Sequence, residues 1–251
     1  MDSYSILELV WLLFTLICLV GIGAGLGKIS SSIYRNASNT PNLVWRYIIL
    51  ITGWLILLFT LAKNGFFAVT TSFPPRLIIS IVVPSIAILL FSFSTIGVRL
   101  LNAVPAHSLI LMQSFRIVVE ILIWYTYVES KLPIQMTFEG KNADILSGLL
   151  ALPAGYYLWK YKKDSPKLVL AYNLTGIALL LNILIVAVLS FPTPLRYFTN
   201  EPSNIIISRF PYIVLPGVLV PIAIAMHVFS LRKMVLNRDK RDELTSQVEL
   251  P

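Results

Sequence analysis

The chain has 251 residues, of which 57% are hydrophobic and only 13% are charged, and its formal net charge is +8. Soluble domains are about 25% charged, so this composition excludes an ordinary soluble globular domain and favours a membrane protein. Most of the positive charge lies in short connections and near the C-terminal end, where membrane orientation explains it better than a nucleic-acid partner does.

Long apolar runs recur along nearly the whole chain. A hydrocarbon core about 30 Å thick requires about 20 such residues per helix. The sequence therefore predicts an all-α, polytopic bundle of seven transmembrane helices, followed by a charged tail at 232–251. The predicted spans are approximately 5–27, 43–62, 77–98, 107–128, 144–161, 168–190 and 210–231.

Lysine and arginine residues divide unequally between alternate connections. Thirteen of the twenty fall on the side of the C-terminal tail, six fall on the other side, and Arg116 lies inside a span. Because cytoplasmic connections are enriched in Lys and Arg, we expect an outside N-terminus and a cytoplasmic C-terminus in a bacterial-type inner membrane. The stretch from Met1 to Leu7 has no Lys or Arg and carries Asp2, which argues against a cleaved signal peptide.

Prolines fall inside three of the predicted spans, one of them being Pro153 in the fifth. The last span contains Pro211, Pro216 and Pro221, and the third contains Pro84. Proline removes a backbone donor and kinks or breaks a helix, so we expect a kinked third span and no regular helix in the last one. Non-helical backbone at membrane depth is tolerated where it lines a cavity or is buried in protein.

The fourth predicted span carries ionisable residues in an otherwise apolar sequence. At about 100° per residue, Gln113, Arg116 and Glu120 fall on one helical face. Ionisable groups near mid-bilayer cost roughly 2.5–3.5 kcal/mol each on insertion scales and are functional-site hypotheses by default. The Arg116 guanidinium has five donors, more than one carboxylate uses, so we expect further partners, with Asn182 and Gln113 as candidates.

The connection from Glu129 to Asp144 is the longest polar one on the expected outer side. Asn142 or Asp144 is suited to cap the fifth span, because such side chains accept free backbone N–H groups. The segment is interpreted either as an ordinary hydrated loop or as a lid over the Arg116–Glu120 face. The resulting hypothetical pocket is lined by Gln113, Arg116, Glu120 and Asn182, opens outward, and is rimmed by Glu139, Asn142, Asp144 and Arg209.

Three roles for the Arg116–Glu120 face remain open. It holds helices together, or Arg116 binds an anion or carboxylate, or Glu120 takes part in proton-coupled work. The leading class is accordingly a sensor or transporter of a small molecule, with an anion as one candidate. A structural or assembly subunit and a membrane-embedded enzyme or haem carrier are the alternatives, the last resting on His107 and His227.

Several enzyme classes are excluded by missing motifs. There is no HExxH zinc motif and no Gly-x-Ser-x-Gly elbow. The last span lacks the lysine that a retinal Schiff base needs, and the single Cys18 offers no disulfide or CxxC pair. We therefore predict no catalytic residue, no metal ligand and no cofactor; the expected partners are the lipid bilayer and a small-molecule ligand.

Two segments carry a resemblance to a known family. The segment Gln113-Ser-Phe-Arg-Ile-Val-Val-Glu120 is followed by Met136-Thr-Phe-Glu-Gly-Lys-Asn-Ala-Asp-Ile-Leu-Ser-Gly148. Together they resemble an uncharacterised family of bacterial multi-pass, seven-helix membrane proteins of no known activity. The resemblance implies no function, but it implies that the fourth span and the 139–144 loop form one unit, which makes the lid as good an interpretation as the hydrated loop.

Overall fold

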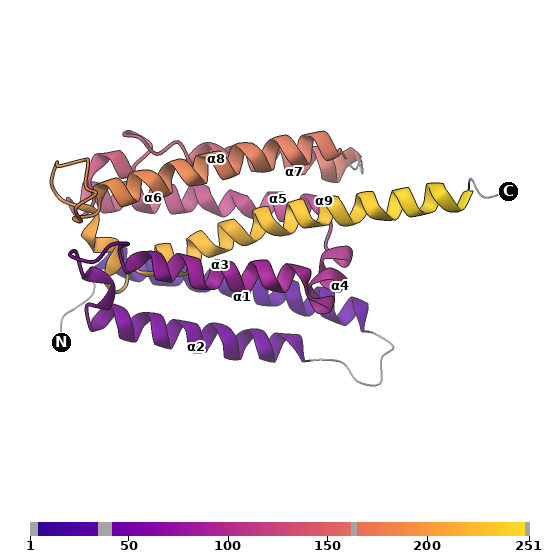
Figure 1. Ribbon diagram of the computed structural model, residues 1–251, viewed down its shortest axis with the longest axis horizontal. Helices are drawn as coiled ribbons and strands as arrows, with labels where there is room; N and C mark the ends of the chain where they lie inside the picture. The colour runs from indigo at the N-terminus through magenta and orange to yellow at the C-terminus, as the bar shows by residue number, and fades with distance from the viewer. Residues whose placement is uncertain (1–4, 35–41, 162–164, 249–251) are drawn as a thin grey trace.

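The computed structural model describes residues 5–34, 42–161 and 165–248, and within these ranges the chain is all-α, without strands. Its long helices lie side by side along the longest axis of the molecule (Figure 1). The elements are α1 (Ile6–Ile33), α2 (Leu43–Lys63), η1 (Phe66–Ala68), α3 (Leu77–Phe93), α4 (Thr95–Ala103), α5 (Ala106–Leu111), η2 (Met112–Ser114), α6 (Phe115–Val128), η3 (Ile134–Met136), α7 (Ile145–Tyr161), α8 (Pro166–Ser190), η4 (Asn204–Ser208), η5 (Leu215–Leu219) and α9 (Val220–Val248).

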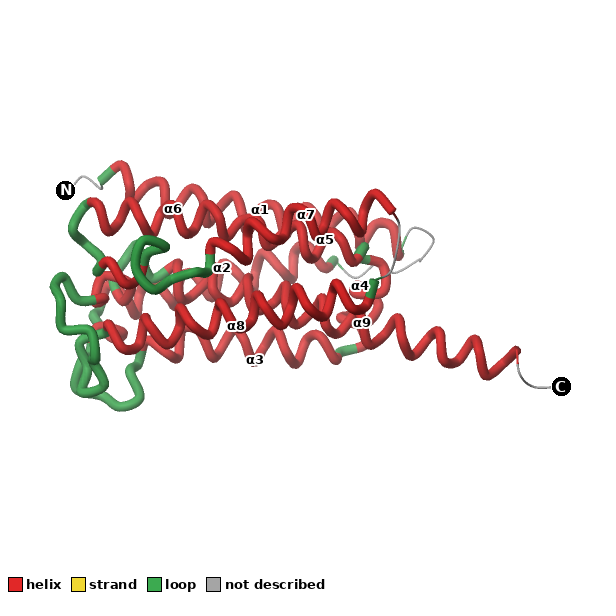
Figure 2. Tube along the Cα trace, turned by 90° about the horizontal axis from the view of Figure 1, so that it is seen from above, coloured by secondary structure: helices red, strands yellow, loops and turns green. Residues whose placement is uncertain are grey.

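The two ends of the bundle differ. The connections 64–76, 129–144 and 191–214 gather at one end, called the loop end, as the green segments of Figure 2 show. At the opposite end, called the tail end, α9 extends beyond the bundle and continues to Val248 (Figure 1). The charged tail that the sequence predicts from residue 232 therefore begins as a continuation of the last helix.

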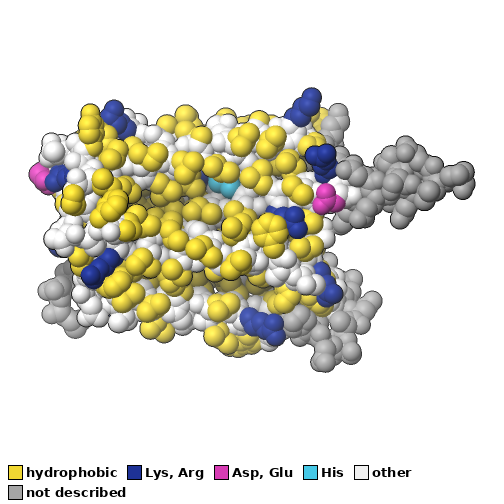
Figure 3. Space-filling view, in the orientation of Figure 1, with side chains coloured by type: hydrophobic (Ala, Val, Ile, Leu, Met, Phe, Trp, Pro, Cys, Tyr) yellow, Lys and Arg dark blue, Asp and Glu magenta, His cyan; other side chains and the backbone are white. Residues whose placement is uncertain are grey.

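The lateral surface of the bundle suits a membrane. Figure 3 shows a face covered mainly by hydrophobic side chains, with Lys and Arg side chains gathered toward the two ends. In the described part of the chain, five segments are long and apolar enough to cross a bilayer, and the bent pair α3–α4 makes a sixth if it counts as one span. These five are Ile6–Ile33, Leu43–Lys63, Ala106–Val128, Pro166–Ser190 and Leu215–Asp239.

The predicted count of seven spans is thus supported only as five or six. The predicted span 144–161 coincides with α7, which has 17 residues, at the short end of what a bilayer core requires. The predicted span 77–98 is wrong at its end, because α3 stops at Phe93 and α4 leaves at 79°.

Local chemistry explains the break between α3 and α4. The Ser94 backbone is extended, and its side-chain oxygen accepts the N–H of Gly97 at 3.0 Å, which caps the new helix. A Cβ on residue 97 would clash with the carbonyl oxygen of Phe91, so the tight corner requires glycine. α3 itself continues through Pro84.

The last predicted span is broken as its prolines predict. η5 is a π-helical turn that contains Pro216, and it leads into α9, where Pro221 follows. Pro221 has no N–H to donate to the carbonyl of Gly217, and that oxygen accepts the indole N–H of Trp54 on α2 at 2.8 Å. Of the candidate spans, Leu215–Asp239 is the most buried and α2 the least, so α9 forms the centre of the bundle.

Candidate functional site

The site is built where α7 packs antiparallel against α5 and α6. A Cβ on Gly148 would lie 2.9 Å from the backbone nitrogen of Ile117, and one on Gly155 would lie 3.3 Å from that of Leu111. Small residues at such positions allow two helix backbones to approach closely. The two contacts also set the register, which places the start of α7 at the level of Glu120.

The connection 129–144 therefore returns into the bundle. α6 continues eight residues past Glu120 to Val128, so α7 begins about 12 Å below the end of α6 at 1.5 Å per residue. Figures 1 and 2 show the connection lying alongside the helices before α7 begins. Its residues Gln135, Met136, Thr137, Asn142 and Asp144 are buried, as irregular backbone at membrane depth requires.

Arg116 is the centre of a buried polar network. Its side chain is 2% exposed; Nε donates to Asp144 Oδ2 at 2.8 Å, and Nη2 donates to Asp144 Oδ1 in the same two-point pair. Nη1 donates to Ser147 Oγ at 2.7 Å and lies 3.1 Å from His227 Nε2. We call Arg116, Asp144, Ser147 and His227 the Arg116 network; it joins α6, the start of α7, and α9.

The contacts of His227 fix its tautomer. Nε2 faces an arginine N–H, so this nitrogen accepts, and Nδ1 must carry the proton, which it donates to Asn173 Oδ1 at 2.9 Å. The Asn173 amide nitrogen donates in turn to Ser230 Oγ and to the carbonyl of Val169, both at 2.8 Å. Both ring nitrogens of His227 are therefore engaged, so the residue offers no free ligand for a haem iron.

Glu120, one helical turn from Arg116, is surrounded differently. Its Oε2 accepts from Asn142 Nδ2 at 2.5 Å, and the same amide donates to the carbonyl of Met136 at 2.9 Å. In the chain as described, no further hydrogen bond reaches the Glu120 carboxylate. Asn142 Oδ1 accepts the backbone N–H of Asp144 at 3.0 Å, just before α7. Asn142 thus closes the turn ahead of α7, whereas the Asp144 side chain binds Arg116 and does not cap the helix.

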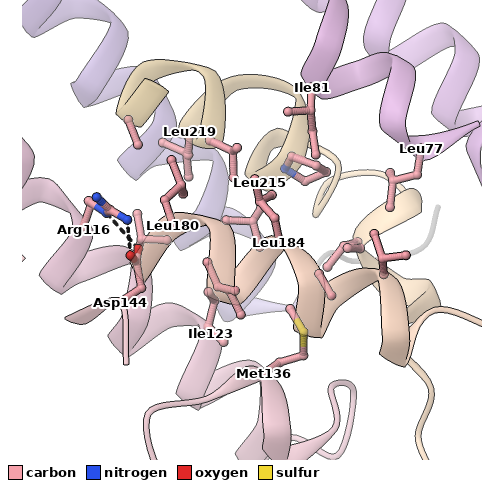
Figure 4. A pocket seen from close by; sticks show the side chains of 18 of the residues that line it. Leu77, Ile81, Arg116, Ile123, Met136, Asp144, Leu180, Leu184, Leu215 and Leu219 are labelled. Atoms are coloured by element: carbon pink, nitrogen blue, oxygen red, sulfur yellow. Dashed lines mark hydrogen bonds and ion pairs between the residues drawn. The ribbon is translucent and has the colours of Figure 1, made fainter. Parts of the chain in front are cut away.

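A cavity of about 280 Å³ lies beside these groups. Its wall is formed by aliphatic and aromatic side chains of α3, α6, α8 and η5–α9, with Met136 from the returning connection (Figure 4). The lining residues with ionisable side chains are Arg116, Glu120 and Asp144, and Figure 4 shows the Arg116–Asp144 pair at one edge of the cavity. The structure therefore presents an apolar chamber with a carboxylate and a closed ion pair at its margin.

The other residues predicted for the pocket lie elsewhere. Gln113 is buried and donates to the carbonyl of Ala223 at 3.2 Å, outside the cavity wall. Glu139 and Arg209 are exposed at the loop end. Asn182 is also exposed and donates to the carbonyl of Lys141 at 2.7 Å; it lies about 200° around the helix from Leu180, which faces the cavity.

Sequence reasoning paired Arg116 with the wrong partners. It named Asn182 and Gln113, whereas the structure supplies Asp144, Ser147 and His227. Ser147 and Asn173 gave no signal, because a single serine or asparagine in an apolar run is ordinary. For Asp144 there was a usable signal, because the family resemblance grouped the 139–144 loop with the fourth span. The contact between Asp144 and Arg116 agrees with that grouping.

Comparison with known proteins gives one family. A family model described as Domain of unknown function (DUF8737) matches residues 74–235, more than half of the chain. The matched region runs from the start of α3 into α9 and includes the whole Arg116 network, Glu120 and the cavity wall. No curated protein and no solved structure matches the chain.

Proposed function

The chain belongs to this family of unknown function, and we propose that it is a multi-pass membrane protein that binds a small, largely apolar molecule, as a sensor or a transporter. The observation that carries the proposal is the apolar cavity of about 280 Å³ bounded by Arg116, Glu120 and Asp144. Ligand sites are typically apolar chambers of roughly 300–1,000 Å³ with a few placed polar groups. Ionisable groups within a membrane protein mark such sites.

Access to the cavity is proposed from the side of the bilayer, between α3 and α8. Both helices pack against α9. Of the lining residues, Val82 of α3 is exposed and Leu184 of α8 is half-buried. Toward the loop end the returning connection covers the cavity with Met136, held through Asn142. In this proposal the 129–144 connection is the lid that the sequence suggested, and the pocket opens laterally.

The finer membrane topology is part of the same proposal. We propose seven spans, with α7 as a short span completed by the returning connection, in a bacterial inner membrane. The N-terminus is outside and the C-terminus cytoplasmic, which agrees with the larger number of Lys and Arg residues on the tail side. In a Cys18→Ser background, a membrane-impermeant maleimide should label Glu139→Cys in intact cells and Lys160→Cys only after permeabilisation; the reverse pattern contradicts this orientation.

The second candidate is a structural or assembly subunit. The Arg116 network favours it, because four of the five Arg116 N–H groups have internal acceptors on two other helices. Under this alternative the cavity is a packing space, and substitutions in its wall alter stability without altering the response to any added molecule.

A matched pair of substitutions on α8 separates the two candidates. Leu184 lines the cavity, whereas Leu181 is 53% exposed on the same helix and outside the cavity wall. Leu184→Trp fills the mouth, and Leu181→Trp adds the same bulk to the outer surface. The probe is decanol, added to the purified full chain in nanodiscs while the midpoint of thermal unfolding is measured.

We expect decanol at about a hundred times its dissociation constant to raise the unfolding midpoint by about 5 °C or more. This rise should appear in the wild type and in Leu181→Trp, and it should be lost in Leu184→Trp. Equal responses of all three proteins would leave the structural alternative as the better account.

A further inference from the structure

The guanidinium of Arg116 is largely occupied by internal partners. Four of its five N–H groups point at Asp144, Ser147 and His227. An anionic head group would therefore have to displace Asp144, and the displaced carboxylate would remain in an apolar surrounding, which is costly. The geometry disfavours the anionic ligand that Arg116 suggests in the sequence.

The carboxylate of Glu120 has fewer hydrogen-bond partners than the guanidinium of Arg116. Glu120 is 2% exposed and lines the cavity, and its recorded partner is the Asn142 amide on Oε2. A buried carboxylate accepts several hydrogen bonds when ionised, and polar groups out of water are costly when their capacity is unused. The carboxylate is therefore the polar group of the cavity wall with unused acceptor capacity.

The charges of the lining residues point the same way. Arg116 and Asp144 neutralise each other as a pair, and an ionised Glu120 would add a negative charge that no other lining side chain compensates. A cationic head group would bring the formal charge of the cavity margin to zero. An additional anion would double the uncompensated charge.

From these contacts we propose that the cavity selects an amphipathic cation, an amine whose ammonium group donates to the Glu120 carboxylate while its apolar chain fills the chamber between α3 and α8. The ammonium group has three donors and no acceptor, which complements a carboxylate. The chain of such a molecule would contact side chains such as Ile81, Leu184 and Leu219, all of which line the cavity. This proposal rests on the proposed function and adds the class of ligand to it.

Three probes with the same ten-carbon chain test the head group. Decylammonium, decanol and decanoate are titrated against the purified full chain in nanodiscs, and Leu184→Trp gives the background from partition into lipid. A charge-assisted hydrogen bond is stronger than a neutral one, so decylammonium should bind wild type about tenfold or more tightly than decanol. Decanoate should bind most weakly. Glu120→Gln should reduce the affinity for decylammonium to about that for decanol. The affinity of this variant for decanol should stay within about twofold of the wild-type value.

A second measurement does not depend on the folding of Glu120→Gln. Decyltrimethylammonium keeps the positive charge but has no N–H donor, so it should bind wild type more weakly than decylammonium. Equal affinities of wild type for decylammonium and decanol, or the tightest binding for decanoate, would overturn the proposed ligand class. In that case, binding of decanol that Leu184→Trp abolishes would still support the proposed function. Absence of specific binding by every probe would contradict both proposals.

Discussion

Arg116 and Glu120 lie one turn apart on the same helix face, yet they belong to two different regions. Four of the five Arg116 N–H groups have internal acceptors, at the start of α7 and on α9. Glu120 lines the apolar cavity, and its carboxylate accepts a hydrogen bond from one amide. The difference underlies the proposal that these two residues of one span have separate tasks, one in holding helices together and the other in meeting a ligand.

The sharpest way to break this comparison is to remove one member of the ion pair. Arg116→Gln leaves the Asp144 carboxylate buried without its charged partner. Asp144→Asn likewise leaves the Arg116 guanidinium buried without its charged partner. Breaking a buried pair costs about 3–5 kcal/mol, so each variant should lower the free energy of unfolding by that amount. The measurement is equilibrium unfolding of the purified protein in detergent.

The double variant Arg116→Gln/Asp144→Asn supplies the control for that experiment. Because the double variant contains no uncompensated charge, it should lose clearly less than the sum of the two single losses. Strictly additive losses would show that the two side chains are not coupled, and the Arg116 network would then not be the structural unit described above.

The returning connection 129–144, the proposed lid, is the next most sensitive part. Asn142→Ala removes two donated hydrogen bonds, to Glu120 and to the carbonyl of Met136, from a buried position. Leaving these groups unsatisfied should cost about 2 kcal/mol and speed amide hydrogen exchange at residues 136–144. Asn182→Ala, at an exposed site with a single bond to the Lys141 carbonyl, is the matched control and should have a small effect. Similar exchange in both variants would contradict the assigned role of Asn142.

The smallest expected effect concerns the space in front of His227. A Cβ on Gly176 of α8 would lie 2.9 Å from His227 Nε2 and 3.0 Å from Ser147 Oγ, so Gly176→Ala crowds the Arg116 network. Overpacking of about 1–3 kcal/mol is partly offset by the helix propensity of alanine, which leaves a net loss of about 1 kcal/mol. Gly25→Ala, where a Cβ meets nothing within 4 Å, should be neutral or stabilising by thermal unfolding. A stabilised Gly176→Ala would show that the network has room that the structure does not show.

The sequence predicted those features that depend on hydropathy and local chemistry. The all-α class, the membrane character and the broken helix at Pro216 and Pro221 follow from apolar run length and from the missing proline donor. The boundary at Ser94 was missed, because α3–α4 is apolar across the break and the corner depends on a serine cap and a glycine contact.

The site was predicted in part. Helical periodicity placed Arg116 and Glu120 on one face, and Asn142 and Asp144 were expected above it. Their actual partners depend on the returning connection, whose depth follows from the α6–α7 register and not from any local pattern. Asn182 was misplaced because the sequence alone did not say which face of α8 turns inward.

The central claim is that the cavity holds a ligand on Glu120 while Arg116 stays paired with Asp144. The most direct test is a cryo-electron microscopy map of the full chain in a lipid nanodisc with decylammonium. The account predicts elongated density in the cavity between α3 and α8, ending within hydrogen-bond distance of the Glu120 carboxylate, with the Arg116–Asp144 pair intact. An empty or collapsed cavity, or density on Arg116 with Asp144 displaced, would contradict it.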